Sequence, residues 1–159
     1  MNIQQIDDNR LNLYSKVISK KKIQKIISHT INNFISFTNI NENFCSQLKA
    51  EITVRFTNRS EIKKLNYNYR KKDKVTDVLT FIYHPFPNLS ADIVICLPFT
   101  REFSHKHKIS NENNLCHLLV HGTLHATGLD HIVKKEAIKM EMLEIKILNY
   151  FKVSNPYEY

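Results

Sequence analysis

The sequence contains very little glycine: of its 159 residues, only Gly122 and Gly128 are glycine. Both lie in the segment HGTLHATGLDH at residues 121–131, which also holds three histidines. Glycine is the residue that accommodates sharp turns and close backbone approaches. We therefore expect both glycines to occupy positions where a side chain is not tolerated.

Long apolar runs and paired cysteines are also missing. No stretch approaches the roughly 20 apolar residues that a membrane-spanning helix requires, and the polar N-terminus has no signal-peptide pattern. Cys45, Cys96 and Cys116 form neither a CxxC pair nor an even-numbered framework. We therefore expect reduced, mostly buried thiols in a cytoplasmic protein that has no membrane partner.

Acidic residues are outnumbered, with 15 Asp and Glu against 23 Lys and Arg, which gives a net charge of +8. A basic domain of this size favours a polyanionic partner, and nucleic acid is the commonest one. The alternative is a compositional drift towards lysine that has no functional meaning.

The hydrophobic pattern predicts one α+β domain over residues 1–159, with a small mixed sheet of about four strands covered by helices. The histidine helix is expected to pack centrally, and the last helix to bury Ile138, Met142, Ile145 and Leu148. Ser60 is the expected N-cap of a short helix that carries Ile62, Leu65 and Tyr69, and Pro98 and Ser110 mark two helix starts. The expected strands are residues 11–18, 51–57, 78–83 and 91–97, and the main helices are residues 22–37, 111–126 and 134–151.

The histidine segment predicts a metal site. His121 and His125 are four residues apart on a predicted helix, so both imidazoles project from one face. Gly128 can take the left-handed conformation that ends a helix and turns the chain back, which would bring His131 towards the pair. Three imidazoles at about 2.0–2.1 Å with a fourth position open are typical of catalytic zinc. We therefore predict one Zn²⁺ per chain, bound by His121, His125 and His131.

The spacing HxxxHxxGxxH is the ligand pattern of metzincin peptidases. Those enzymes carry a glutamate general base directly after the first histidine, where this chain has Gly122. The substitution argues against peptide hydrolysis. It also predicts open space beside the metal, suited to a bulky substrate.

Two neighbours of the histidines are alternative ligands. His117 lies four residues before His121 and would share its helix face, but a His117 ligand leaves His131 and Gly128 without a role, so we expect a core or supporting residue. Cys116 points about 140° away from His121 on a helix and is expected in the core. His105 and His107 lie in a basic stretch and are expected at the surface.

A second group of functional residues lies in the segment LNYNYRKKDKVTDVLTF at residues 65–81. It places four cations among two tyrosines immediately before a predicted strand. Arginine can fork onto a phosphate and tyrosine can stack on an unpaired base, so the segment predicts an RNA-facing surface. A solvated loop is the alternative interpretation.

Together with DIVI at residues 92–95, these two segments resemble the YbeY family of bacterial endoribonucleases, the rRNA maturation factors. The resemblance implies a metal-dependent, single-strand-specific endoribonuclease that matures the 3′ end of 16S rRNA and acts in ribosome quality control. Its partners would be single-stranded RNA and the ribosome, with no DNA. The family's zinc ligands carry over onto His121, His125 and His131, with His121 and Arg70 as the catalytic residues.

The chain departs from the family pattern at Ala91, at Thr80-Phe81-Ile82 and at Ala126-Thr127, none of which is an expected ligand. The sequence leaves the nucleophile open between a water molecule and the RNA 2′-hydroxyl, and it identifies no carboxylate as a general base. Two rival functions remain at this stage, a metzincin-like metallopeptidase and a non-catalytic ribosome-assembly factor whose zinc fixes the fold.

Overall fold

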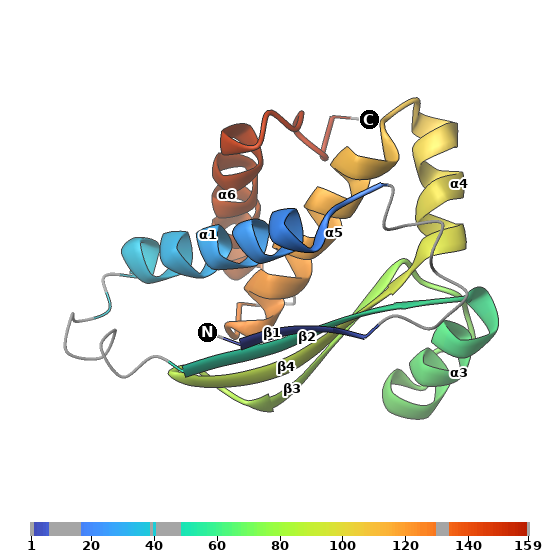
Figure 1. The fold of residues 1–159 in the computed structure, drawn as a ribbon, viewed down its shortest axis with the longest axis horizontal. Coiled ribbons are helices and arrows are strands. Elements are labelled where there is room, and N and C mark those ends of the chain that lie inside the picture. Colours follow the sequence, from blue (N-terminus) through green and yellow to red (C-terminus); the bar gives the residue numbers. More distant parts are fainter. Residues whose placement is uncertain (1, 7–16, 39, 41–48, 130–133, 159) are drawn as a thin grey trace.

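The computed structural model describes residues 2–6, 17–38, 40, 49–129 and 134–158. A four-stranded sheet carries its helices mainly on one side (Figure 1). This arrangement confirms the predicted α+β class. In chain order the elements are β1 (Asn2–Ile6), α1 (Lys20–Thr38), β2 (Lys49–Thr57), α3 (Arg59–Arg70), β3 (Val78–His84), β4 (Asn88–Cys96), α4 (Leu97–His107), α5 (Asn111–Ala126) and α6 (Lys134–Tyr150).

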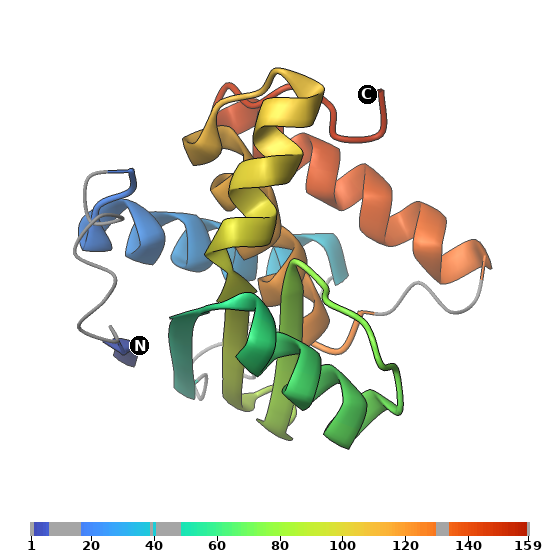
Figure 2. The ribbon, with the colours of Figure 1, turned by 90° about the vertical axis from the view of Figure 1, so that its right-hand side faces the viewer.

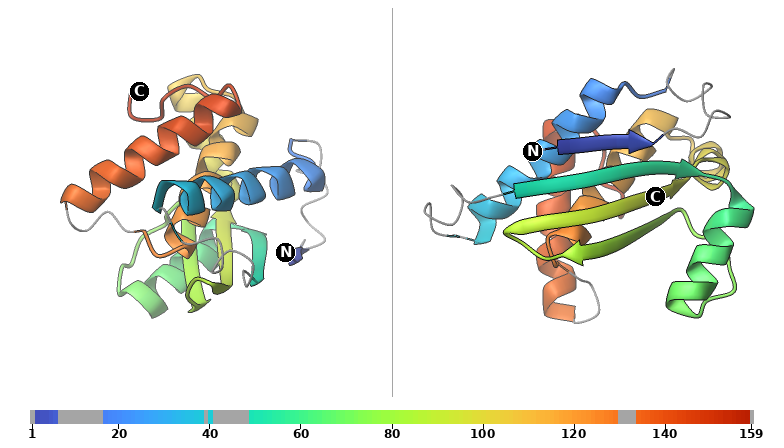
Figure 3. Two further views of the ribbon diagram at one scale, coloured as in Figure 1. Left: turned by 90° about the vertical axis from the view of Figure 1, so that its left-hand side faces the viewer. Right: turned by 60° about the horizontal axis from the view of Figure 1, so that its bottom comes forward.

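The sheet is mixed, with strand order β1-β2-β4-β3. Strands β1, β2 and β4 are parallel, and β3 runs antiparallel to β4 at one edge (Figure 3). Three of the predicted strands are confirmed as β2, β3 and β4. The remaining strand is β1, whereas the strand predicted at residues 11–18 lies mostly outside the described residues, and its last two residues are not in a strand.

Alternation along the strands creates two separate cores, one on each face of the sheet. Ile52 and Ile93 face the main core under α1, α5 and α6. Leu79 and Cys96 face the opposite way and pack with Ile62 of α3. Figure 2 shows α3 in front of the strands, on the far side from α5. The sheet therefore separates the histidine helix from α3.

Helix α5 is the central helix, and its predicted bounds are confirmed. It contacts α1, α4, α6, β3 and β4. Ser110 caps its first turn by accepting a hydrogen bond from the Asn113 N–H at 3.0 Å. The buried residues include all those predicted for its core face, Leu115, Leu118, Leu119, Val120 and Leu124.

Two local predictions are wrong. The N-cap of α3 is Asn58, whose side-chain oxygen accepts from the Glu61 N–H, so Ser60 lies within the first turn. Helix α6 buries a face that overlaps only partly with the predicted one: Leu148 is buried as predicted, but Ile138 is 49% and Met142 63% exposed. Its buried residues are Met140, Leu143, Glu144, Ile147 and Leu148.

The α6 error has a physical cause. The face that is buried carries a carboxylate, Glu144, and an unpaired buried charge is strongly disfavoured. The structure accepts this face because Glu144 is paired inside the core.

None of the helices in the described ranges has both the length and the apolar character that a membrane span requires.

Candidate metal centre

His121 and His125 meet on one face of α5, as their spacing predicts. Their Nε2 atoms are 3.1 Å apart. Two nitrogens bound to one tetrahedral ion at about 2.0–2.1 Å would be separated by about 3.3–3.4 Å. The observed separation therefore fits two ligands of one ion with a shift of only a few tenths of an ångström.

The end of α5 orients the His125 ring. Gly128 adopts a left-handed backbone with φ 97°, as predicted, and lets the chain turn back on the helix. The Gly128 N–H donates to His125 O and the Leu129 N–H to Leu124 O, the two bonds of a Schellman motif. The turn brings the Leu129 carbonyl oxygen to 3.0 Å from His125 Nδ1. A carbonyl can only accept, so His125 carries its proton on Nδ1 and presents the Nε2 lone pair.

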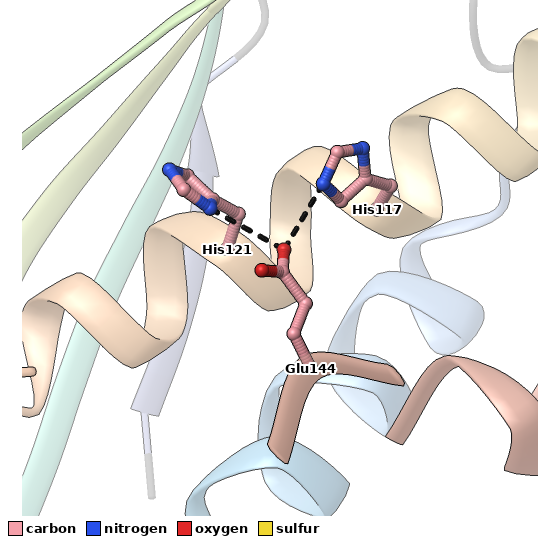
Figure 4. A group of neighbouring side chains, drawn as sticks. All are labelled: His117, His121 and Glu144. Carbon is pink, nitrogen blue, oxygen red and sulfur yellow. Dashed lines mark ion pairs between the residues drawn. The ribbon is translucent and has the colours of Figure 1, made fainter. Parts of the chain in front are cut away.

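Glu144 of α6 performs the corresponding role for His121 (Figure 4). Its side chain is fully buried, and its Oε1 lies 3.0 Å from His117 Nε2 and 3.3 Å from His121 Nδ1. Both contacts are close, but the one to His121 is not a well-aligned hydrogen bond. The carboxylate favours a proton on His121 Nδ1, because a lone pair there would face a negative oxygen. His121 therefore also presents an Nε2 lone pair.

The second oxygen of Glu144 is bound by the C-terminal segment. The Tyr157 hydroxyl donates to Glu144 Oε2 at 2.6 Å. Burial opposes ionisation of Glu144, but the contacts with His117 and His121 outweigh it and lower its pKa to about 2. Burial, together with the bond to Glu144, raises the pKa of Tyr157. The carboxylate is therefore charged under all ordinary conditions and holds the two histidines and the tyrosine together.

These tautomers explain why the site suits a cation. If both Nδ1 atoms carry protons, the two Nε2 lone pairs face each other at 3.1 Å and repel. A shared metal ion turns that repulsion into coordination. Metal-binding histidines commonly donate their other N–H to a carboxylate or a backbone carbonyl, and this pair has one of each.

A second arrangement of possible ligands lies beside the first. His117, His121 and Glu144 offer ligand atoms that all lie within 4.8 Å of one another, so the described residues include a His-His-Glu group able to hold a metal ion. His121 belongs to both arrangements, through Nδ1 here and Nε2 in the pair with His125. The third predicted ligand, His131, lies outside the described residues.

The prediction of open space beside Gly122 is wrong. A Cβ built there would lie 2.8 Å from Ile93 Cγ2 and 3.2 Å from Thr80 Oγ1. The Thr80 hydroxyl also donates to the Gly122 carbonyl at 3.3 Å. Consecutive helical residues point about 100° apart, so Gly122 faces the sheet while His121 faces α6. Glycine is needed here for close packing of helix on sheet, not for access to the metal.

Arg70 lies apart from the buried cluster, at the exposed C-terminus of α3. Lys71 ends the helix in a left-handed conformation, and its N–H donates to Tyr67 O at 3.0 Å. The chain then leads into β3, the strand whose Thr80 contacts α5. The basic segment and the histidine helix are thus connected through one edge strand.

The remaining predicted residues are not in the cluster. Cys116 is buried in the core as expected, and burial raises its pKa to about 12. Cys96 is buried under α3, and Cys45 lies outside the described residues. His105 is exposed as predicted, and His107 is half-buried against the Phe103 ring.

Sequence reasoning missed Glu144 and Tyr157. A signal was present, because Glu144 falls on the helical face formed by Met140, Leu143 and Ile147. A lone carboxylate on an apolar face needs a partner. His117 is the complementary signal, a histidine on the same face of α5 as His121 that was expected to be a core or supporting residue.

Comparison with known proteins decides the family. The sequence model of endoribonuclease YbeY matches residues 9–152. The chain belongs to the YbeY family. It is 40% identical to the endoribonuclease YbeY of Buchnera aphidicola subsp. Acyrthosiphon pisum over 159 residues, covering 96% of this chain and 92% of that one.

Other relatives agree. The chain is 37% identical to endoribonuclease YbeY of a Polaromonas species over 141 residues, covering 88% of this chain and 82% of the relative. Identity to the Polynucleobacter asymbioticus protein of the same name is 46% over 111 residues, covering 69% and 72%. A solution structure of a Thermotoga maritima protein is similar with a TM-score of 0.51 and 23% identity, covering 99% and 95% of the two chains. That last similarity concerns the fold alone.

Proposed function

We propose that the chain is a zinc-dependent endoribonuclease that cleaves single-stranded RNA. Endoribonuclease activity follows from membership of the YbeY family. The observation that supports a metal-dependent mechanism is the pair of Nε2 atoms 3.1 Å apart, each oriented by an acceptor at its own Nδ1. In this proposal the whole chain, residues 1–159, acts as one domain.

The proposed ligands are His121, His125 and His131, with one zinc ion per chain. This set is preferred over His117, His121 and Glu144 because Glu144 is already held by Tyr157 and by two imidazoles, and its side chain has no exposed surface. A catalytic ion needs an open coordination position, whereas Glu144 lies in the core. Zinc, when bound, supplies a Lewis acid that polarises a phosphoryl oxygen and makes water more acidic.

The protein's own residues divide the remaining tasks. Glu144 fixes the His121 ring, Leu129 O fixes the His125 ring, and His117 shares the charge of Glu144. Arg70 offers a planar fork that matches two phosphate oxygens, so it is proposed to hold the reacting phosphate and stabilise its developing charge. His121 acts as both a metal ligand and a catalytic residue.

The proposed substrate is the 3′ region of the 16S rRNA precursor, recognised on or near the ribosome in the cytoplasm. Its support is the family resemblance and the net charge of +8, which favours a polyanion. Neither DNA nor a membrane surface is part of the proposal.

A single-turnover cleavage assay tests the function. Wild-type protein treated with a chelator should lose cleavage of a labelled single-stranded RNA and regain it when zinc is restored. The same RNA annealed to its complement serves as the control and should be cleaved much more slowly. A zinc-loaded protein that binds RNA without cutting it would instead be the non-catalytic assembly factor.

The packing around Gly122 argues against the metallopeptidase alternative. A peptidase of that type needs a glutamate where this chain has Gly122. The Cβ of any side chain at this position would overlap Ile93 of the sheet.

A further inference from the structure

A small cavity opens on the face of the sheet that faces away from the histidine helix. Its volume is about 200 Å³. It is lined by Tyr69 of α3, by Phe81 and Tyr83 of β3 and by Val94 of β4, and Arg55 and Asp92 supply polar groups. Pockets for drug-sized ligands are about 300–1,000 Å³. The cavity is therefore suited to a single ring system.

The walls are aromatic and exposed. Tyr69 is 68% and Tyr83 59% exposed. The Tyr69 and Phe81 rings are 5.0 Å apart at an interplanar angle of 68°, so they meet edge to face and leave a ring face open rather than closing on each other. Exposed aromatic faces of this kind are the usual platforms for unpaired bases.

Of the two polar groups of the cavity, Arg55 is paired with Glu61, so Asp92 is the one that favours a ligand with hydrogen-bond donors. The Tyr83 hydroxyl donates to Asp92 Oδ2 at 2.9 Å, which fixes the carboxylate. A carboxylate accepts several hydrogen bonds, so Asp92 retains acceptor capacity towards the cavity. Nucleobases combine flat apolar faces with N–H donors at their edges, which is the complement of this lining.

The charge around the cavity favours a polyanion. Apart from Arg59, which is paired with Glu102, helix α3 and the residues after it carry six cations, and Asp73 in the same stretch is paired with Lys63 at 3.2 Å. Tyr69, in the cavity wall, is followed directly by Arg70, the proposed phosphate-binding residue. The six cations are Lys63, Lys64, Arg70, Lys71, Lys72 and Lys74.

We propose that this cavity binds one unpaired base of the RNA substrate, next to the phosphate held by Arg70. The inference rests on the proposed function and adds a base-binding subsite to it. Strand β3 connects the two sites, because Thr80 contacts the histidine helix on one face and Phe81 lines the cavity on the other. An RNA strand that passes around this sheet edge would contact both.

Abasic scanning tests the subsite. A labelled single-stranded RNA is prepared as a series in which one nucleotide at a time, near the cleavage position, lacks its base. With wild-type protein, removal of one particular base should weaken binding by about 10-fold or more, the scale for a lost stacking contact. With Tyr69→Ala, the intact RNA should bind about 10-fold more weakly, and removal of that base should cause no further loss.

The matched control is Tyr67→Ala. Tyr67 is an exposed tyrosine of the same helix, at 56%, and does not line the cavity. This variant should keep the wild-type response to the abasic series, and melting temperatures should be unchanged in both variants because both side chains are exposed. Equal sensitivity to base removal in wild type and Tyr69→Ala would overturn the subsite. A wild-type protein that neither binds nor cuts the intact RNA would overturn the proposed function, and the subsite with it.

Discussion

The two faces of the sheet hold their functional residues in opposite ways. Between α5 and α6, Glu144 is fully buried and the polar groups around it fix one another: Tyr157 and His121 contact Glu144, and Leu129 O contacts His125. On the α3 face, Tyr69, Arg70 and Tyr83 are exposed. The difference follows from the tasks. A metal needs ligands fixed before it binds, whereas a flexible RNA strand needs reachable cations and rings.

This comparison predicts that substitutions between α5 and α6 alter stability and metal affinity, while those on the α3 face alter RNA binding and cleavage alone. The largest effect is expected for Glu144→Ala, which leaves two imidazoles and a hydroxyl without the charge they surround. Removing one partner from a buried charged cluster lowers the free energy of unfolding by about 3–5 kcal/mol, which urea denaturation measures. Glu136→Ala, at an exposed position of α6, is the control.

Glu144→Gln separates the effect of the charge of this side chain from the effect of its shape. It keeps the shape of the side chain but not its charge, so the protein should fold while zinc affinity falls by about 10–100-fold, the scale for a lost orienting partner. Chelator competition measures the affinity. Unchanged zinc affinity in a folded Glu144→Gln would show that the carboxylate does not orient the metal ligands.

Arg70→Ala is the counterpart on the exposed face. Zinc content and melting temperature should stay at wild-type values, while single-turnover cleavage falls by about 100-fold, the scale for one lost transition-state donor. Compared with Arg70→Ala, Arg70→Lys should restore RNA binding more fully than it restores the cleavage rate, because lysine offers no bidentate fork. If Arg70→Ala cleaves normally, or fails only because it unfolds, its catalytic role is withdrawn.

Gly122→Ala tests the contact between helix and sheet. The added methyl would lie 2.8 Å from Ile93 Cγ2, and overpacking of this kind costs about 1–3 kcal/mol. Thermal unfolding of the metal-free protein measures it without interference from zinc. A fully stable Gly122→Ala would mean that α5 can shift on the sheet, and that glycine is required for another reason.

The smallest effect is expected for Tyr157→Phe. The change removes the hydroxyl that donates to Glu144 Oε2 at 2.6 Å, and a lost hydrogen bond to a charged group costs about 1.5–3 kcal/mol when buried. Tyr157 is 48% exposed, so water replaces part of the loss and about 1 kcal/mol is expected. Tyr150→Phe, another exposed tyrosine near the C-terminus, controls for loss of a hydroxyl.

The sequence predicted most of what depends on local pattern. The bounds of α5, its Ser110 cap, its core face and the turn at Gly128 follow from short-range rules that the structure obeys. Less of the candidate site could be predicted from the sequence. Glu144 was missed because two faces of α6 are apolar, and the partners that allow the face with a carboxylate to be buried come from α5 and from the C-terminal segment.

Gly122 also shows that tertiary contacts cannot be predicted from a local sequence pattern. Because glycine is rare in this chain, Gly122 was correctly predicted to lie where a side chain has no room. The sequence did not predict which neighbour fills that space. Proximity to the histidines suggested the metal, whereas the 100° step along the helix points this residue at Ile93 and Thr80 of the sheet. Which face of a helix meets the sheet is a property of tertiary packing.

The central claim is that the metal is held through the Nε2 atoms of His121 and His125 together with His131, and that His117 and Glu144 support it. Zinc content of purified His131→Ala and His117→Ala, measured by elemental analysis on folded protein, tests it most directly. We expect that His131→Ala loses most of its zinc and that His117→Ala keeps about one ion per chain. The reverse pattern, full zinc in His131→Ala and none in His117→Ala, would contradict this ligand set and place the metal on the His117, His121 and Glu144 group.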